Sequence, residues 1–398
     1  MKSSPTRILL VVPSASSFRV FLRELAERWV AEGGEIAVAT ADDLPGVVDD
    51  GWPRGVLRFA LPDFRKGGVL GVFRAGWALR RIAREWRPQL VHAHLGVAAL
   101  VCALVRGSHQ AKWIATIQGL HGSIRESGAG MIGWVERWCA TRLDRTYVVS
   151  EMDRAFLGQR VDALRLGVQR GFGCDLRRFD SARFSAERRL EIRESLSLES
   201  DDPVMIFLGR QVAFKGFATV IRAWNLARRE LPNVRLLLVG AADPVHSNGL
   251  NRDEAALLAD PALRNLGWRT DVEALLAIAD VCVFPSRREG MPVNLMEALA
   301  MGVPVITSDS RGCRDVVRDG VDGIVMATAE PAAWAQACLA LLRDEAQRAA
   351  YRAAALAGRG RFDRQLFIDE QLGIWRGFAC RDTFGREHLA PRRENLSL

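Results

Sequence analysis

The sequence of 398 residues lacks several patterns that would assign it to common protein classes. Its longest apolar run, residues 95–105, is shorter than the roughly 20 residues that a helix needs to cross a bilayer. The opening residues, MKSSPTRILLVV, contain too short an apolar core for a signal peptide and lead directly into strand-like sequence. We therefore expect a protein of the cytoplasm.

Other missing motifs narrow the chemistry. The seven cysteines include no Cys-x-x-Cys pair, which favours reduced, mostly buried thiols over disulfides or a zinc site. No Asp-x-Asp triplet is present, so a catalytic divalent cation has no evident carboxylate ligands in the sequence. Residues 11–18, VVPSASSF, lack the Gly-x-Gly-x-x-Gly that a nicotinamide dehydrogenase needs after its first strand.

Charge is distributed unevenly along the chain. The net charge of +8 resides in the first 180 residues, which hold 26 Lys and Arg against 18 Asp and Glu, while the remainder is neutral. This asymmetry indicates either a solvated basic surface or a polyanionic partner, such as an anionic membrane, a lipid diphosphate or nucleic acid. Nucleic acid is disfavoured because the second half is neutral and no nucleic-acid-binding motif is present.

Residues 70–87, LGVFRAGWALRRIAREWR, have the pattern of a basic amphipathic helix. Phe73, Trp77 and Trp86 would line one face of this helix, with arginines elsewhere. Such a helix either lies on an anionic membrane or, more commonly, packs its apolar stripe on its own sheet. The sequence leaves both interpretations open.

Short apolar runs alternate with amphipathic helical segments through most of the chain. The runs of strand length are residues 7–12, 35–40, 90–94, 112–117 and 145–150, followed by 203–209, 235–241, 280–286 and 304–309. Continuous apolar strands separated by helices are typical of parallel sheets covered on both faces. We predict an α/β fold of two doubly wound, Rossmann-like domains that face each other across a cleft.

The domain boundary is expected in the charged stretch 175–202. Residues 1–180 would form the first domain and 181–370 the second, with 371–398 as the end of a C-terminal helix and a polar tail. Doubly wound domains bind ligands beyond the carboxyl ends of their strands, so the natural site is the cleft between the two domains.

Two cations follow the first strand-like run of the second domain. In FLGRQVAFKGF (207–217), the strand ends at Gly209, and Arg210 and Lys215 lie in the loop before the next helix. Arg binds phosphate oxygens in a bidentate manner and Lys acts as a point charge, so the pair suits a diphosphate. Basic residues in such loops are common, and this motif alone is weak.

A second loop carries two glutamates eight residues apart. In RREGMPVNLMEALAMG (287–302), Glu289 lies in the loop and Glu297 lies in the helix that Pro292 opens as a good first helical residue. Free N–H groups at the start of that helix favour an anion, and carboxylates accept hydrogen bonds from vicinal hydroxyls. At 1.5 Å per helical residue the two carboxylates lie about 12 Å apart at most, which suits a hexose and a ribose on either side of a diphosphate. The alternative is a surface Glu and a helical Glu paired with a nearby Arg.

These motifs together resemble those of GT-B glycosyltransferases of family GT4, the retaining group that uses nucleotide sugars. The resemblance spans about residues 5–375 and is strongest over 203–326, where the Glu-x7-Glu motif and the Arg–Lys pair lie. Residues 265–325 are similar to members that build bacterial capsule, O-antigen or exopolysaccharide. SRREGMP and GCRDVV resemble a subgroup that uses UDP-N-acetylhexosamines or related UDP-sugars on polyprenyl-diphosphate acceptors, and GFGCDLRRF (171–179) resembles its interdomain turn.

The resemblance implies a role for each matching residue. Glu289 would bind donor-sugar hydroxyls, Glu297 would bind the ribose, and Arg210 and Lys215 would stabilise charge on the leaving diphosphate. Further donor contacts are implied for the backbone of Gly290, Met291 and Val293 and, more weakly, for the side chains of Trp268 and Arg269. Many family members carry a histidine after the strand equivalent to 112–117, whereas this chain has Gln118 there and His121 three residues later. Either residue is a candidate contact to donor or acceptor.

The resemblance therefore predicts a retaining hexosyltransferase on the inner face of the plasma membrane. Its donor would be a nucleotide sugar, its acceptor a lipid-linked saccharide, and its basic N-terminal half would meet the anionic membrane. We expect no metal cofactor, with front-face attack and the leaving phosphate taking the acceptor's proton. The alternative is a nucleotide-sugar 2-epimerase of similar fold, against which the small number of histidines argues mildly.

Overall fold

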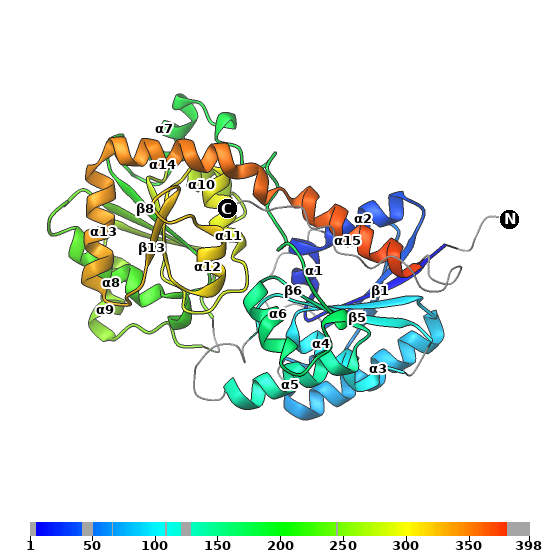
Figure 1. The fold of residues 1–398 in the computed structure, drawn as a ribbon. Helices are drawn as coiled ribbons and strands as arrows, with labels where there is room; N and C mark the ends of the chain where they lie inside the picture. The colour runs from blue at the N-terminus through cyan, green and yellow to red at the C-terminus, as the bar shows by residue number, and fades with distance from the viewer. Residues whose placement is uncertain are drawn as a thin grey trace.

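Two parallel sheets organise the chain, and each lies in a separate half of the sequence. The computed structural model describes residues 5–41, 51–65, 67–107, 110–120, 129–243 and 246–379. Figure 1 shows the two α/β domains side by side, with the C-terminal domain on the left and the N-terminal domain on the right. The predicted fold class is confirmed.

The N-terminal sheet has seven parallel strands in the order β3-β2-β1-β4-β5-β6-β7. The strands are β1 (Arg7–Val12), β2 (Glu35–Thr40), β3 (Val56–Ala60), β4 (Leu90–His94), β5 (Lys112–Ile117), β6 (Arg145–Val148) and β7 (Leu166–Val168). The connecting helices are α1 (Ala15–Phe21), α2 (Arg23–Ala31), α3 (Gly68–Trp86), α4 (Gly96–Val105), α5 (Ala129–Arg142) and α6 (Glu151–Gly158). The strand order reverses between β1 and β4, which creates a crevice at their carboxyl ends.

The C-terminal sheet has six parallel strands in the order β10-β9-β8-β11-β12-β13. These are β8 (Val204–Leu208), β9 (Arg235–Val239), β10 (Leu263–Gly267), β11 (Val281–Phe284), β12 (Val305–Ser308) and β13 (Gly323–Met326). The accompanying helices are α7 (Ala186–Ser195), α8 (Phe217–Ala227), α9 (Arg252–Ala256), α10 (Val272–Ala277), α11 (Val293–Ala300), α12 (Arg311–Val316), α13 (Pro331–Arg343) and α14 (Glu345–Gly358). Here the order reverses between β8 and β11, whose loops carry the predicted site residues.

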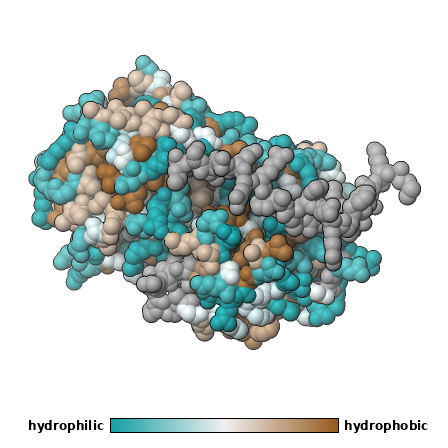
Figure 2. Space-filling view, in the orientation of Figure 1, coloured by the Kyte–Doolittle hydropathy of each residue, from teal (hydrophilic) through white to brown (hydrophobic). Residues whose placement is uncertain are grey.

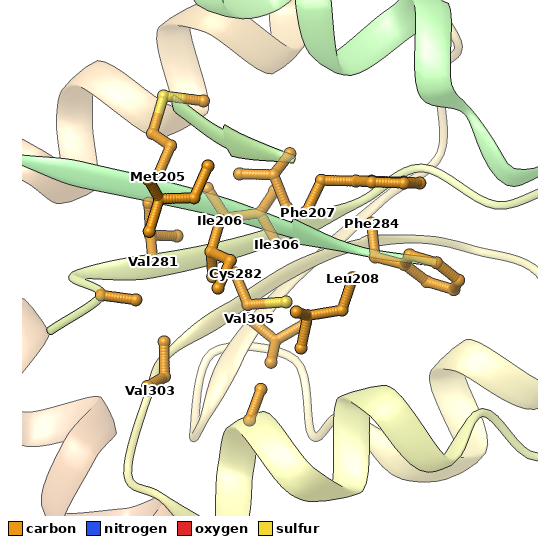
Figure 3. Close-up of a cluster of buried hydrophobic side chains, with 14 of the residues drawn as sticks. Met205, Ile206, Phe207, Leu208, Val281, Cys282, Phe284, Val303, Val305 and Ile306 are labelled. Carbon is orange, nitrogen blue, oxygen red and sulfur yellow. The ribbon is translucent and has the colours of Figure 1, made fainter. Parts of the chain in front are cut away.

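Burial explains why the central strands of this sheet are apolar throughout. Every residue of β8 and β11 is buried, since helices cover both faces. Figure 3 shows side chains of β8, β11 and β12, among them Phe207, Cys282 and Ile306, packed together in this core. Rigid packing of this kind holds the loops at the strand ends in register.

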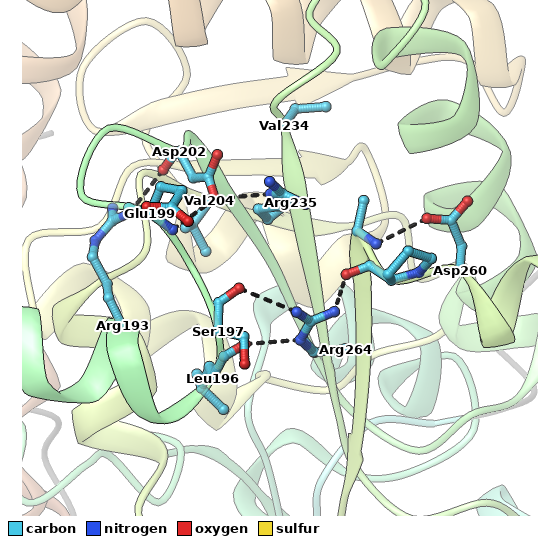
Figure 4. Close-up of polar contacts among 12 residues, drawn as sticks. Arg193, Leu196, Ser197, Glu199, Asp202, Val204, Val234, Arg235, Asp260 and Arg264 are labelled. Atoms are coloured by element: carbon cyan, nitrogen blue, oxygen red, sulfur yellow. Dashed lines mark hydrogen bonds and ion pairs between the residues drawn. The ribbon is translucent and has the colours of Figure 1, made fainter.

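The amino ends of the same strands are tied by polar contacts (Figure 4). Arg235, at the start of β9, pairs with the buried Asp202 at 2.8 Å, and Arg264 of β10 donates to the carbonyl oxygens of Leu196 and Ser197. Arg193 donates to the carbonyl oxygens of residues 199 and 202. These charges lie at the edge opposite the predicted site and serve the fold.

Helix α15 (Arg364–Ala379) returns from the C-terminal domain and packs on the N-terminal domain, as the red-orange helix of Figure 1 shows. Its Phe367, Leu372 and Trp375 are buried in the core that contains β1 and α2. The Trp375 indole donates a hydrogen bond of 2.9 Å to Nδ1 of the buried His92. Of the segment 371–398, predicted as a helix end and polar tail, residues 371–379 lie in α15 and residues 380–398 lie outside the described residues.

Helix α3 corrects the more common of the two interpretations of residues 70–87. Phe73 and Trp77 do not pack on the sheet; their exposed fractions are 58% and 70%, while Trp86 is partly buried. The helix packs instead through small and aliphatic side chains, including Ala75, Leu79 and Ile82. The large aromatic residues are therefore on the outer face of the domain.

The expected state of the cysteines can be checked for six of them. Cys102, Cys139, Cys174, Cys282, Cys313 and Cys338 are free and buried, whereas Cys380 lies outside the described residues. Burial raises the pKa of the Cys338 thiol to about 12. A thiol held protonated is a poor nucleophile and a poor metal ligand, so these residues act as small apolar groups in the cores.

Candidate functional site

Adjacent strands bring the two predicted loops together. Val281 of β11 lies beside Met205 of β8, so the loops after both strands leave the same edge of the sheet. The N–H of Arg287 donates to the carbonyl oxygen of Phe214 at 2.9 Å, which joins the loops directly. Gly216 adopts a φ of +78°, and a Cβ there would come within 2.4 Å of the Pro285 oxygen. Only glycine allows this turn without strain.

Lys215 and Glu289 form an ion pair at the centre of the joined loops. The Lys215 Nζ lies 2.5 Å from Glu289 Oε1, and the side chains are 19% and 9% exposed. The Lys215 ammonium also lies 5.6 Å from the centre of the Phe284 ring. In these partly dry surroundings the pair is held firmly, and the ammonium retains two further N–H groups for a ligand.

Arg210 is held separately from this pair. Its Nη1 lies 2.5 Å from Oδ2 of Asp243, which follows β9 and is 9% exposed, while the Arg210 side chain is 51% exposed. The guanidinium also lies over the Phe214 ring at 5.5 Å. Asp243 thus orients Arg210 at the rim of the strand ends and leaves much of the guanidinium in solvent.

The turn from β11 into α11 presents backbone donors. Pro292 is the N-cap of α11 and not its first helical residue, a small correction to the expectation from sequence. The N–H groups of Gly290, Met291 and Val293 donate to no acceptor within the described part of the chain. The Asn294 side chain donates to the carbonyl oxygen of Leu208 at 2.6 Å and anchors the helix start to the end of β8. This helix start is therefore suited to an anion.

Glu297 lies in the second turn of α11, where burial raises the pKa of its carboxyl group to about 7. Arg178 and Arg364 oppose the rise and Glu273 adds to it. The carboxylate forms no hydrogen bond or ion pair with any residue that the structure describes. The alternative that it pairs with a nearby Arg is not realised there, because Arg178 donates to Glu273 instead, at 2.7 and 2.9 Å.

The weaker candidates lie at the end of β10. The Trp268 side chain is 64% exposed and offers an open aromatic face. Arg269 forms a bidentate pair with Asp271, at 2.8 and 2.6 Å. Arg269 is thus committed to a local contact, while Trp268 is available to stack on a planar ligand.

The N-terminal domain contributes the loop after β5. Gln118 and Gly119 lie directly against Gly290, because a Cβ built on Gly290 would come within 2.4 Å of the Gln118 carbonyl oxygen. The Gln118 Nε2 is buried and has no hydrogen-bond partner among the described residues. His121, the other candidate of this loop, lies outside the described residues.

Several residues near the site were not found from the sequence. Arg178 and Arg364 come from the interdomain linker and the start of α15, and both act on the charge of Glu297. Asp243 orients Arg210, and Asn294 anchors α11. Asn294 could have been noticed from the sequence because it lies at the start of a predicted helix. No sequence pattern relates Arg178, Arg364 or Asp243 to the two glutamates.

A hollow lies where α1 and α2 meet the linker and the start of α15, away from the strand ends that carry the predicted site. It has a volume of about 370 Å³ and is lined by α1, α2, the linker and the start of α15, with Arg19, Arg23, Arg177 and Arg364 among its residues. None of the predicted donor residues lines it. Within the described ranges, no group of three or more His, Cys, Asp or Glu side chains is arranged to hold a metal ion.

Comparison with known families assigns both halves of the chain. Residues 19–168 match the model described as Glycosyltransferase Family 4, and residues 202–344 match the model described as Glycosyl transferases group 1.

Three relatives with similar sequences are named as transferases. The putative glycosyltransferase EpsD of Bacillus subtilis is 28% identical over 67% of this chain and 70% of its own length. A D-inositol 3-phosphate glycosyltransferase of Salinispora tropica is 28% identical over 84% of this chain and 75% of its own. The N,N'-diacetylbacillosaminyl-diphospho-undecaprenol alpha-1,3-N-acetylgalactosaminyltransferase of Campylobacter jejuni is 26% identical over 46% of this chain and 47% of its own.

Solved structures share the fold at low sequence identity. Sucrose-phosphate synthase from Thermosynechococcus elongatus superimposes with a TM-score of 0.77 at 21% identity, covering 94% of this chain and 100% of that one. Anabaena HepE, solved in complex with UDP and glucose, has a TM-score of 0.73 at 20% identity, covering 94% and 99%. At these identities the likeness concerns the arrangement of the two domains.

Proposed function

The chain belongs to the GT-B glycosyltransferases of family GT4, and from this premise we propose that it transfers a hexose or N-acetylhexosamine from a UDP-sugar to a polyprenyl-diphosphate-linked saccharide during surface polysaccharide synthesis. The observation that carries the proposal is the Lys215–Glu289 pair, held where the loops of β8 and β11 meet, with free helix N–H groups and Glu297 further along α11.

Glu289 and Gln118 are proposed to bind the donor sugar. The Glu289 carboxylate accepts hydrogen bonds from ring hydroxyls, and its contact with Lys215 fixes its direction. The buried Gln118 amide has an unused N–H that a sugar oxygen can accept from. A buried donor without a partner is destabilising by about 1–3 kcal/mol, which a bound sugar would relieve.

The diphosphate would lie between the cations and the start of α11. Lys215, Arg210 and the N–H groups of Gly290, Met291 and Val293 together provide positive charge without large rearrangement. Groups held in advance of the reaction stabilise charge that develops on the leaving diphosphate, and each such donor contributes about 3 kcal/mol in comparable sites.

The nucleoside would lie at the far end of the site. Glu297 accepts hydrogen bonds from two ribose hydroxyls, for which its carboxylate has no competing donor in the described structure. Trp268 offers its exposed face to the base, while Arg269 keeps its hydrogen bonds to Asp271. HepE was solved with UDP, which supports uridine as the nucleoside here.

The reaction is proposed to retain the anomeric configuration. The acceptor hydroxyl attacks from the side on which the diphosphate leaves, and a phosphate oxygen of the leaving group takes the hydroxyl proton. Lys215 and Arg210 stabilise the resulting charge, so the proposal needs no metal ion. The protein's task in this step is to position the two substrates and to hold the diphosphate.

The lipid part of the acceptor is proposed to bring the protein to the inner face of the plasma membrane. On α3, Val69, Leu70, Phe73 and Trp77 are exposed, and on α5, Met131 and Trp134 are exposed. Both helices pack against α4 on one face of the N-terminal sheet. Figure 2 shows hydrophobic side chains reaching the surface along the lower rim of this domain. Exposed Arg74, Arg80, Arg81 and Arg84 accompany them and suit anionic headgroups.

None of the helices that the structure describes is both long enough and apolar enough to span a bilayer. The Campylobacter relative is named for a lipid diphosphate acceptor, which supports the proposed acceptor. The D-inositol 3-phosphate transferases support a second candidate, transfer to a soluble sugar-alcohol phosphate. The exposed apolar side chains of α3 and α5 favour the lipid-linked acceptor.

The proposal is tested by screening purified protein against UDP-, GDP- and ADP-sugars. We expect binding and slow hydrolysis of one or more UDP-sugars, and transfer when a polyprenyl-diphosphate saccharide is added. Inositol 3-phosphate serves as the competing acceptor. Absence of binding to every nucleotide sugar would overturn the proposed reaction, and transfer to inositol 3-phosphate alone would favour the second candidate.

A further inference from the structure

A buried ion pair joins the two domains beside the proposed site. Arg311, the first residue of α12, pairs through Nη1 with Oδ1 of Asp153 in the first turn of α6. The Arg311 side chain is 9% exposed and the Asp153 side chain is fully buried. Asp153 belongs to the N-terminal domain and Arg311 to the C-terminal domain, so each charge is buried by the presence of the other domain.

The same two side chains hold the loop after β5. Arg311 Nη2 donates to the Leu120 carbonyl oxygen at 3.2 Å, and the Leu120 N–H donates to Asp153 Oδ2 at 3.4 Å. Both backbone groups of Leu120 are therefore bound by the pair. Asp153 is itself oriented by the helix cap, since its N–H donates to Ser150 Oγ at 3.1 Å.

Backbone contacts next to the pair leave no room for side chains. Gly119 has a φ of +91°, and a Cβ there would come within 2.7 Å of the Gly290 Cα. A Cβ on Gly312, the neighbour of Arg311, would come within 2.1 Å of the Gly290 oxygen. Three segments thus meet backbone to backbone: the loop after β5, the Glu289–Gly290 turn and the start of α12.

The proposed donor site draws on both domains. The diphosphate and ribose contacts proposed above all come from the C-terminal domain. Gln118 comes from the other domain and reaches Gly290 only while the loop after β5 stays in place.

We propose that Asp153 and Arg311 are positioning residues for glycosyl transfer, which hold the loop carrying Gln118 against the sugar end of the donor site. This inference rests on the proposed function and assigns different steps of the reaction to different parts of the molecule. Binding of the nucleotide part of the donor depends on the C-terminal domain, whereas transfer depends on the interdomain pair. While the domains are together, removing either partner leaves the other charge buried and unpaired, which strongly destabilises that arrangement. Loss of one partner therefore favours separation of the domains.

The test compares Arg311→Met and Asp153→Asn with a matched control, Arg314→Met. Arg314 lies on the same helix and pairs with Asp309 at 3.0 Å, but this pair is exposed and lies within one domain. We expect kcat to fall about 100-fold in either interdomain variant, as for a misplaced reacting group, with the Kd for UDP in calorimetry unchanged. The control should match the wild type in both measurements.

A double-mutant cycle and solution scattering complete the test. The double variant should lose no more activity than either single variant, because both remove one contact. Without ligand, both single variants should show a larger radius of gyration than the wild type, which is measurable even if the transfer reaction proves different from the one proposed. Wild-type kcat in Arg311→Met, or an unchanged radius of gyration in both variants, would overturn the inference. A loss of UDP binding equal to the loss of kcat would do so as well.

Discussion

Replacing Glu297 with Gln should stabilise the free protein while weakening its binding of UDP. The carboxyl group of Glu297 has a pKa of about 7 in place of 4.5, because it is surrounded by protein. Between these two values the folded protein binds the proton more tightly than the unfolded chain does. The folded state therefore loses stability as pH rises through this window, and the full penalty is present above pH 7.

The magnitude follows from the pKa. At about 1.4 kcal/mol per pH unit, a rise from 4.5 to about 7 corresponds to at most about 3 kcal/mol. The Glu297 residue retains some exposure, so solvent screening reduces the expected penalty to about 1–2 kcal/mol. Glu297→Gln removes the charge and should recover this amount at pH 8 but only about a quarter of it at pH 5, where the carboxyl group of the unfolded chain is already largely ionised.

The assay is urea unfolding of both proteins, followed by tryptophan fluorescence at pH 5 and pH 8. We compare midpoints within the transition of the C-terminal domain, since a two-domain chain need not unfold in one step. Two results would refute burial as the origin of the raised pKa of Glu297. One is that the wild type and the variant have equal midpoints at both pH values, and the other is that the variant is less stable than the wild type at pH 8.

Ligand binding gives the second half of the same prediction. Ribose hydroxyls donate to the ionised carboxylate, so the affinity for UDP should rise as Glu297 ionises. With a pKa of about 7, the ionised fraction is about tenfold greater at pH 8 than at pH 6, and the wild-type affinity should change by about that factor. Glu297→Gln is the control, because the phosphates of UDP titrate equally with both proteins. An identical pH dependence in the two proteins would remove Glu297 from the ribose site.

Three further predictions concern the proposed reaction. Glu289→Gln should reduce transfer about 100-fold or more with the fold intact by circular dichroism, because Glu289 is the proposed sugar ligand and pairs with Lys215; wild-type activity would remove it from the site. EDTA should leave transfer largely unchanged, and loss of activity restored by magnesium would contradict the charge-stabilising role given to Arg210 and Lys215. Phe73→Ser with Trp77→Ser should reduce sedimentation with phosphatidylglycerol vesicles, whereas Leu190→Ser, an exposed apolar position on α7, should not; equal sedimentation of both variants would exclude α3 from membrane contact.

The fold could be predicted because most of its strands are recognisable as short apolar runs in the local sequence. Runs such as 7–12 and 235–241 are apolar after their first residue, an arginine, as buried parallel strands are, and each forms a strand of the sheets. The strands that were not predicted have weaker patterns. β7 has only three residues, and β3, at the sheet edge, has one buried residue, three exposed residues and one of intermediate burial. Such edge strands are defined by pairing with a neighbour, which local sequence does not record.

The candidate site could be predicted only in part. Glu289, Glu297, Arg210 and Lys215 could be singled out as candidates because they lie in loops and in a helix that follow predicted strands. That Lys215 touches Glu289 while Arg210 bonds Asp243 depends on the order of strands in the sheet. Arg178 and Arg364, whose charges act on Glu297, are separated from it by long stretches of chain, and Arg364 comes near only because α15 begins there.

Local sequence thus determined which segments form strands and helices, and which side chains lie at strand ends. Strands buried on both faces appear as continuous apolar runs, and helices appear as apolar residues spaced at a period of 3.6. Tertiary structure decided which face of a helix is turned inward. In α3 both Ala75 with Leu79 and Phe73 with Trp77 make acceptable apolar stripes, and the folded helix, which packs on α4, buries the first and exposes the second. Tertiary structure also paired Asp153 with Arg311, since two charges 158 positions apart meet only when both domains have folded and come together.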